Sequence, residues 1–191
     1  GAARGDEFQV NTLTTGYQEI PAVAIGAQGR FAIAWQSDVS PGTDTDAESI
    51  QGQLFDADAN PLGGQFQVNS HATGSQSRPA LVASAAGELV ITWSSEGSSG
   101  TDSSEESIQA QRYRANGAAS GGEFQVNTYT TDTQSRPSVS LDARGNFVVA
   151  WDSMGSSGTD TSYFSVQAQR FDALFRDGLE TGDASRWSVV V

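Results

Sequence analysis

The stretch Phe8-Gln-Val-Asn11 decides the fold, because it returns as Phe66-Gln-Val-Asn69 and as Phe124-Gln-Val-Asn127, each 58 residues after the last. Other features keep the same interval: Trp35, Trp93 and Trp151, and the Gly-Thr-Asp triplets at 42–44, 100–102 and 158–160. A strict period of this length is typical of repeat proteins, in which each unit buries its apolar face against its neighbours. The chain is therefore one array of repeated units.

Each repeat contains four short strand patterns. In the first repeat the predicted strands are residues 21–25, 30–36, 50–55 and 65–69. Phe31, Ile33 and Trp35 alternate with small residues, which is typical of a strand that lies between packed sheets. No window carries an apolar stripe of helical period over three turns. The sequence predicts an all-β fold of three four-stranded antiparallel meander sheets, arranged like the blades of a propeller or the sides of a prism.

We expect one repeat domain over residues 1–173, followed by a tail at 174–191. The domain divides into an N-terminal strand at 7–11 and repeats at about 12–69, 70–127 and 128–173. The third repeat supplies only three strands, so the N-terminal strand is left over to complete or link a sheet. It can close a ring within its own chain, pair with a second chain so that two chains make a six-sheet ring, or pair head to tail without closing, which generates a filament.

Composition narrows the classes of function. Ten arginines and no lysine stand against 23 acidic residues, which gives a formal net charge of −13. Such a surface repels phosphate backbones, so we expect no nucleic-acid partner. The chain has no cysteine, one histidine and no apolar run near the roughly 20 residues that span a membrane. Since it also lacks a nucleophile elbow and a phosphate-binding loop, we expect no enzyme activity.

The Gly-Thr-Asp loops are the candidate metal sites. Flexible acidic loops can supply the oxygen ligands that Ca²⁺ requires. The candidate ligands are Asp44, Asp46, Asp102 and Asp160. Their spacing matches no established calcium motif. The alternative is that each aspartate closes an Asx-turn on its own loop backbone.

Pairs of glutamines on the third strand of each repeat are candidate sugar-binding groups. They are Gln51 and Gln53, Gln109 and Gln111, and Gln167 and Gln169. Each pair lies beside an aromatic residue, and amides next to an aromatic ring can hold a sugar by hydrogen bonding and stacking. The alternative is a ladder of amides that satisfies loop and strand backbone between the sheets.

Three phrases of the third repeat resemble a tandem repeat of large secreted or cell-surface bacterial proteins. They are Glu123-Phe-Gln-Val-Asn-Thr128, Gly145-Asn-Phe-Val-Val-Ala-Trp151 and Gln167-Ala-Gln-Arg-Phe-Asp172. The resemblance extends over about residues 5–173. It implies an extracellular, propeller-like β-repeat and no particular activity.

The tail from Arg176 to Ser188 resembles a short C-terminal segment of many exported proteobacterial proteins, of the form Asp-Gly-Phe-Glu-Ser-Gly-Asp-x-Ser-x-Trp. Leu179 replaces the Phe of that form and Thr181 the Ser. This resemblance implies export. The β-forming residues 187–191 can add to the edge of a neighbouring sheet, and the alternatives are a strand or cap on the last sheet of the same chain or an export signal.

These observations predict a secreted, non-catalytic structural or adhesive protein that assembles with copies of itself by sharing strands, with a filament as one outcome. The candidate assembly residues are Phe8 and Val10 in the N-terminal strand and Trp187 and Val189 in the tail. The alternative is a carbohydrate-binding module for surface glycans, with or without Ca²⁺. No cofactor other than Ca²⁺ is suggested.

Overall fold

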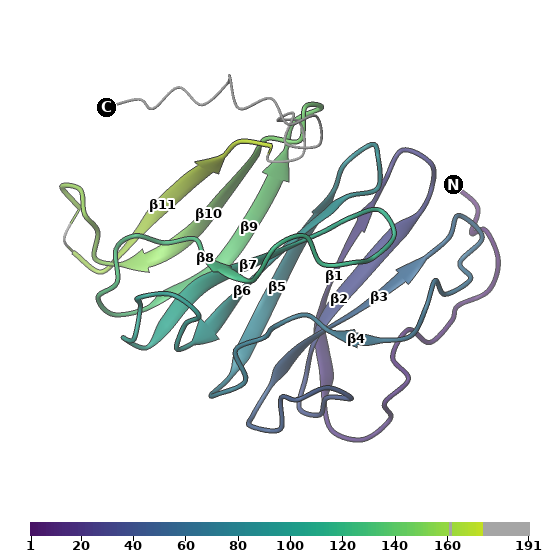
Figure 1. Cartoon of the computed structure of the whole chain (residues 1–191), viewed down its shortest axis with the longest axis horizontal. Helices are drawn as coiled ribbons and strands as arrows, with labels where there is room; N and C mark the ends of the chain where they lie inside the picture. Colours follow the sequence, from purple (N-terminus) through teal and green to yellow (C-terminus); the bar gives the residue numbers. More distant parts are fainter. Residues whose placement is uncertain (161, 174–191) are drawn as a thin grey trace.

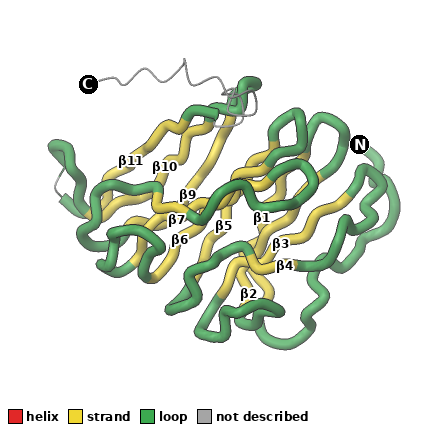
Figure 2. The backbone as a smooth tube through the Cα atoms, viewed as in Figure 1, coloured by secondary structure: helices red, strands yellow, loops and turns green. Residues whose placement is uncertain are grey.

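The structure, a computed structural model, describes residues 1–160 and 162–173 (Figures 1 and 2). These residues contain no helix and form three antiparallel sheets. The first sheet consists of β1 (Gln18–Ile25), β2 (Phe31–Ser37), β3 (Ser49–Phe55) and β4 (Phe66–Gln67). The second consists of β5 (Gln76–Ala83), β6 (Leu89–Glu96), β7 (Glu106–Tyr113) and β8 (Phe124–Gln125). The third consists of β9 (Gln134–Leu141), β10 (Phe147–Met154) and β11 (Phe164–Phe171).

The three sheets stand side by side as an open fan (Figure 1). Strands within a sheet follow chain order, as the predicted meander requires. The first strands of the three sheets are neighbours, since β5 contacts both β1 and β9. The third sheet and the N-terminal segment lie at opposite ends of the fan (Figure 1). The predicted all-β fold of antiparallel meander sheets is therefore confirmed, and the described residues form no closed ring.

The core lies in two layers between the sheets. In one layer, small and branched residues of the first sheet pack on large residues of the second: Ala32, Ala34 and Ile50 on Leu89, Ile91 and Trp93. The other layer repeats this with Val90, Ile108 and Ala110 on Phe147, Val149 and Trp151. Alternate residues of a strand face opposite sides of its sheet, so each sheet has one side rich in large residues and one rich in smaller ones. This confirms the alternation expected from the sequence.

The fourth strands are shorter than the predicted five residues. β4 pairs with β3 through Gln67 opposite Gln51 and Phe66 opposite Gly52, and Val68 N donates to the carbonyl of Ile50 at 2.8 Å. Beyond this point the side chain of Asn69 takes over, because its Oδ1 accepts a hydrogen bond from Ile50 N at 2.9 Å. A side chain at position 52 would collide with the Phe66 ring, since an added Cβ would lie 2.8 Å from Phe66 Cζ.

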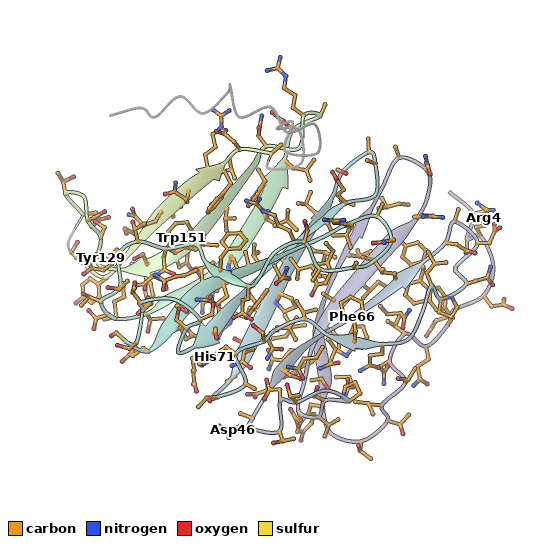
Figure 3. The ribbon with its side chains drawn as sticks, viewed as in Figure 1. Arg4, Asp46, Phe66, His71, Tyr129 and Trp151 are labelled. Atoms are coloured by element: carbon orange, nitrogen blue, oxygen red, sulfur yellow. The ribbon has the colours of Figure 1, made fainter. Side chains whose placement is uncertain are left out.

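The aromatic ring of each fourth strand reaches the next sheet. The ring centroid of Phe66, which Figure 3 labels, lies 5.5 Å from that of Tyr113 in the second sheet. Phe124 repeats the contact with Phe171 of the third sheet at 5.6 Å. The segment therefore joins its own sheet through backbone pairing and the next sheet through its phenylalanine ring.

The prediction of four strands in every sheet is wrong for the third sheet, which has three among the described residues. Residues 7–11 belong to no sheet, so the N-terminal strand does not close the array within its own chain. The Phe8 ring instead lies 5.5 Å from Phe55 in the first sheet, the contact that Phe66 and Phe124 make with their following sheets. The N-terminal segment thus lies where the fourth strand of a preceding sheet would lie.

Core substitutions in either layer should destabilise the array strongly. Replacing Ile108, which is fully buried between the second and third sheets, with Ala should lower the free energy of unfolding by about 2–5 kcal/mol because of lost burial and the cavity left behind. Urea unfolding followed by tryptophan fluorescence measures this. Leu62→Ala in an exposed turn is the control and should cost less than about 1 kcal/mol; equal losses would contradict the assignment of the core.

Candidate functional site

The Gly-Thr-Asp loops of the first two repeats are fixed by a buried polar network. Asn69 Nδ2 donates to Asp44 Oδ2 at 2.7 Å, to Gln76 Oε1 at 2.9 Å and to the carbonyl of His71 at 2.8 Å. Asn127 repeats all three bonds, with Asp102, Gln134 and the carbonyl of Tyr129 as acceptors. Each asparagine therefore holds together the loop before the third strand, its own fourth strand and the first strand of the next sheet.

The carboxylates in this network are almost inaccessible to solvent. Asp44 and Asp102 are each 2% exposed. Burial raises the pKa of both carboxyls, and the hydrogen bonds from the asparagine side chains and loop backbone oppose that shift. The Asx-turn that the sequence offered as an alternative is observed in all three loops: the amides of Asp46, Ser104 and Ser162 donate to Asp44, Asp102 and Asp160.

The four candidate calcium ligands are not brought together. Asp46 Oδ2 accepts a hydrogen bond from Gly74 N at 3.1 Å, and Figure 3 places Asp46 at the loop end of the first sheet. Asp160 is exposed on the third sheet. Among the described residues no three His, Cys, Asp or Glu side chains converge on one point. Calcium binding stays a prediction from sequence.

The six glutamines have different environments along the array. Gln51, Gln53, Gln109 and Gln111 are buried. Gln51 donates to Ser49 Oγ at 2.8 Å, and Gln53 donates to the carbonyl of Leu54 at 2.9 Å. The amide ladder that the sequence offered as an alternative is therefore present in the first two sheets. Only Gln167 and Gln169, on β11, have surface available to a ligand.

A different feature stands out at the free end of the third sheet. We call the side of this sheet that carries Val148, Ala150, Val166 and Arg170 the trailing face. Val166 is 78% exposed, whereas Ile50 and Ile108, its counterparts in the other repeats, are 0% exposed. Within the described residues, nothing covers the trailing face or pairs with the outer edge of β11. Sheet edges and apolar faces of this kind are rarely left bare in soluble proteins.

At the other end of the fan, the first sheet exposes the side opposite to the one that the third sheet exposes. We call the side that carries Val23, Ile25, Phe31, Ile33 and Trp35 the leading face. Val23 and Ile25 are exposed, whereas their counterparts Leu81 and Ala83 pack in the core. A cavity of about 330 Å³ separates the N-terminal segment from this face. Its lining includes Phe8, Val10, Ile33 and Trp35.

The N-terminal segment already holds the side-chain conformation of a fourth strand. Gln9 Nε2 donates to the carbonyl of Asn11 at 2.9 Å, as Gln67 and Gln125 donate to the carbonyls of Asn69 and Asn127. Asn11 Nδ2 donates to the carbonyl of Leu13 at 2.6 Å. The carboxylate and glutamine contacts of Asn69 have no equivalent at Asn11 among the described residues, and Gln18 Oε1 instead accepts from Trp35 Nε1 at 2.8 Å. Of the polar contacts seen at Asn69, only those to the backbone of the same segment are therefore formed at Asn11 within the described part of the chain.

The repeat pattern of the sequence points to Phe8 and Val10 at this end but does not by itself single out the trailing-face residues. A comparison of positions 58 residues apart could have found them, because Val148 and Val166 occupy core positions of the repeat. Trp187 and Val189, the other candidate assembly residues, lie outside the described residues.

Comparisons with known proteins support the fold and leave the function open. Neither a protein-family model nor a curated protein matches this sequence. The chain is similar to a crystal structure of a protein of unknown function from Dyadobacter fermentans DSM 18053, with a TM-score of 0.55 and 10% identity over 82% of this chain and 52% of that one.

A thermostable family-43 glycoside hydrolase gives a TM-score of 0.43 and 13% identity, over 81% of this chain and 53% of that one. A TM-score this low supports no conclusion about the present chain. The chain spans about half the length of both structures.

The asparagine clamp should contribute measurably to stability. Asn127→Ala removes three donated hydrogen bonds and leaves Ile108 N without the acceptor that Asn127 Oδ1 provides at 2.8 Å. Because these groups are buried, the free energy of unfolding should fall by about 2–4 kcal/mol, as measured in urea. The matched control is Asn60→Ala, which removes an exposed asparagine from a turn; a loss as large there would count against the clamp.

The loop carboxyls should titrate in a defined order. Asp44 and Asp102, whose pKa burial raises above the usual 3.8, should keep their protons to higher pH than Asp142, whose pKa the Asn146 side chain lowers. The two buried carboxyls then contribute most to stability below pH 3.8, and that contribution decreases as the pH rises through their folded pKa values. Carboxyl ¹³C NMR titration measures the order, and the reverse order would contradict the burial argument.

Proposed function

We propose that this chain is an extracellular, non-catalytic structural or adhesive β-repeat protein that works by assembling with copies of itself. One observation carries the proposal. Among the described residues the third sheet has no fourth strand, while the strand-forming segment Phe8–Asn11 belongs to no sheet. A sheet edge without a partner and a strand without a sheet are the two halves of a strand-sharing contact.

The apolar surface at both ends of the fan supports assembly as the role of this contact. Exposed large hydrophobic residues gather on the end sheets, with Val23 and Ile25 on one and Val148 and Val166 on the other. Their counterparts between neighbouring sheets are buried or partly buried. The ends of the fan thus have the composition of a core interface, which favours association over a solvated surface.

A structural or adhesive role also agrees with the chemistry of the described residues. Their buried acids and amides serve the loops and strands, and no cluster of metal-ligating side chains accompanies them. Export is proposed from the composition and from the two resemblances of sequence, and none of the described residues forms a helix that could cross a membrane. Carbohydrate binding has weaker support, because four of the six candidate glutamines are buried.

Assembly can be tested by measuring mass in solution with multi-angle light scattering over a range of protein concentrations. We expect the chain to exceed the 20.0 kDa of one copy and Val166→Asp to return it to that mass, since a charge would replace an apolar contact. Ala118→Asp in an exposed turn of the second sheet adds the same charge and should leave the mass unchanged. A chain that stays monomeric at all concentrations would contradict the proposal, and glycan binding by that monomer would favour the carbohydrate-binding alternative.

A further inference from the structure

We propose that two copies of this chain close head to tail into one six-sheet ring, in which the trailing face of each copy packs on the leading face of the other. The N-terminal segment of each copy then supplies the fourth strand of the other copy's third sheet. This inference rests on the proposed assembly function and specifies its interface, its register and its number of copies.

The trailing face of the third sheet and the leading face of the first sheet carry the same kinds of residue as the two surfaces that pack together between the second and third sheets. Val148 lies opposite Arg170 on the trailing face of the third sheet, as Val90 lies opposite Arg112 on the second. On the leading faces, Phe31 stacks on Phe55 in the first sheet at 4.9 Å and 11°, and the rings of Phe147 and Phe171 stack in the third at 4.7 Å and 11°.

The contact between the second and third sheets shows how these surfaces meet. The guanidinium of Arg112 lies over the rings of Phe124 and Phe147, 5.2 and 4.9 Å from their centroids. The contact between the first and second sheets is different, because Leu54 stands at the arginine position and Leu89 at the phenylalanine position. For Arg170, the residues equivalent to Phe124 and Phe147 are Phe8 and Phe31 of a second copy. In the ring, Arg170 would therefore cover these two rings as Arg112 covers Phe124 and Phe147.

The repeat also fixes the backbone register of the shared strand. Gln51 pairs with Gln67 and Gly52 with Phe66 in the first sheet, and Gln109 with Gln125 and Ala110 with Phe124 in the second. The equivalent pairs in the third sheet are Gln167 with Gln9 and Ala168 with Phe8 of the second copy. The N-terminal segment needs no large rearrangement, because the Phe8 ring already rests against Phe55.

Docking in this register completes the polar network. Gln67 Oε1 accepts from Asp44 N at 3.0 Å, and Gln125 Oε1 accepts from Asp102 N at 2.9 Å. In the ring, Gln9 Oε1 would accept from the amide of Asp160 in the other copy, and Asn11 Nδ2 would donate to that aspartate's carboxylate. Asp160, the one exposed member of the three repeated aspartates, would then become buried as Asp44 and Asp102 are.

The cavity under the N-terminal segment has the position required for the incoming apolar side chains. It lies on Ile33 and Trp35, the counterparts of Ile91 and Trp93, which pack in one cluster with Ala34 and Ile50 of the preceding sheet. The residues that correspond to Ala34 and Ile50 on the trailing face are Ala150 and Val166. The second copy would therefore fill the cavity of about 330 Å³ with Ala150 and Val166.

The number of copies follows from the number of sheets. Propeller rings contain about four to eight sheets, and six is the only multiple of three in that range. A head-to-tail interface gives a closed ring when its rotation returns to the start.

Disulfide trapping tests the register, since the natural sequence contains no cysteine. In the double variant Gln9→Cys/Gln167→Cys, mild oxidation should give a covalent dimer on a non-reducing gel and a two-copy mass by light scattering. The control is Gln9→Cys/Gln169→Cys, which moves one thiol two residues along the strand on the same side of the sheet. It should cross-link at least about tenfold more slowly, because diagonal side chains are farther apart than directly opposite ones.

The other outcomes of this experiment separate the two proposals. A ladder of covalent multimers would overturn the closed ring, and a cross-linked monomer would mean that the strand closes the array within one chain. A stable dimer without cross-linking would overturn this interface but leave the assembly function standing. A monomeric mass without cross-linking would overturn both proposals.

A charge reversal tests the interface without cysteines. Arg170→Glu should weaken dimerisation at least about tenfold, because the desolvated arginine–aromatic contact is lost, and the far-ultraviolet circular dichroism should not change. Arg114→Glu, in an exposed turn of the second sheet, makes the same change in net charge and should shift the dimer dissociation constant by less than about threefold. Equal effects of the two variants would mean that net charge, and not this contact, controls association.

Discussion

Both faces of every sheet in this array are apolar, and the rest of the structure follows from that constraint. Each sheet presents large residues such as Trp93 on one side and smaller ones such as Ile108 on the other. The two faces of the second sheet are covered by the first and third sheets. A linear row always leaves one face bare at each end, so more sheets of the same kind cannot remove the problem. Only closure, a cap or further association can, since hydrophobic burial is the main favourable term in folding.

The repeated sequence Phe-Gln-Val-Asn contributes both to strand pairing within a sheet and to the packing of that sheet on the next one. Through Gln67 and Phe66 it completes a sheet, and through the Phe66 ring and the Asn69 amide it attaches that sheet to the next. Strand pairing and sheet packing are therefore not independent, because the same few side chains carry both. A buried polar network of this kind is favourable only when its members are satisfied, and for this reason the incomplete network at Asn11 supports the proposed assembly.

Much of this arrangement could be read from the sequence, because period-two alternation and a fixed repeat determine strands, faces and core tryptophans. The short fourth strand could not, since a side chain of Asn69 in place of a backbone acceptor leaves no trace in a hydropathy pattern. Buried Gln51 and exposed Gln169 occupy the same face of equivalent strands, so alternation does not distinguish a structural amide from an accessible one. The pairing of Arg112 with Phe147 became visible only when the facing surfaces were known.

Equivalence between positions 58 residues apart also bears on how such a protein can evolve. Duplication or loss of one whole unit by recombination inserts or removes a sheet together with the linker that attaches it, so the remaining junctions keep their contacts. An array of four units reaches the range of about four to eight sheets found in propeller rings, whereas an array of three units falls below it. Under the proposed assembly, one recombination event would change a ring shared by two copies into a self-contained ring, so the number of units in an array would determine its quaternary structure.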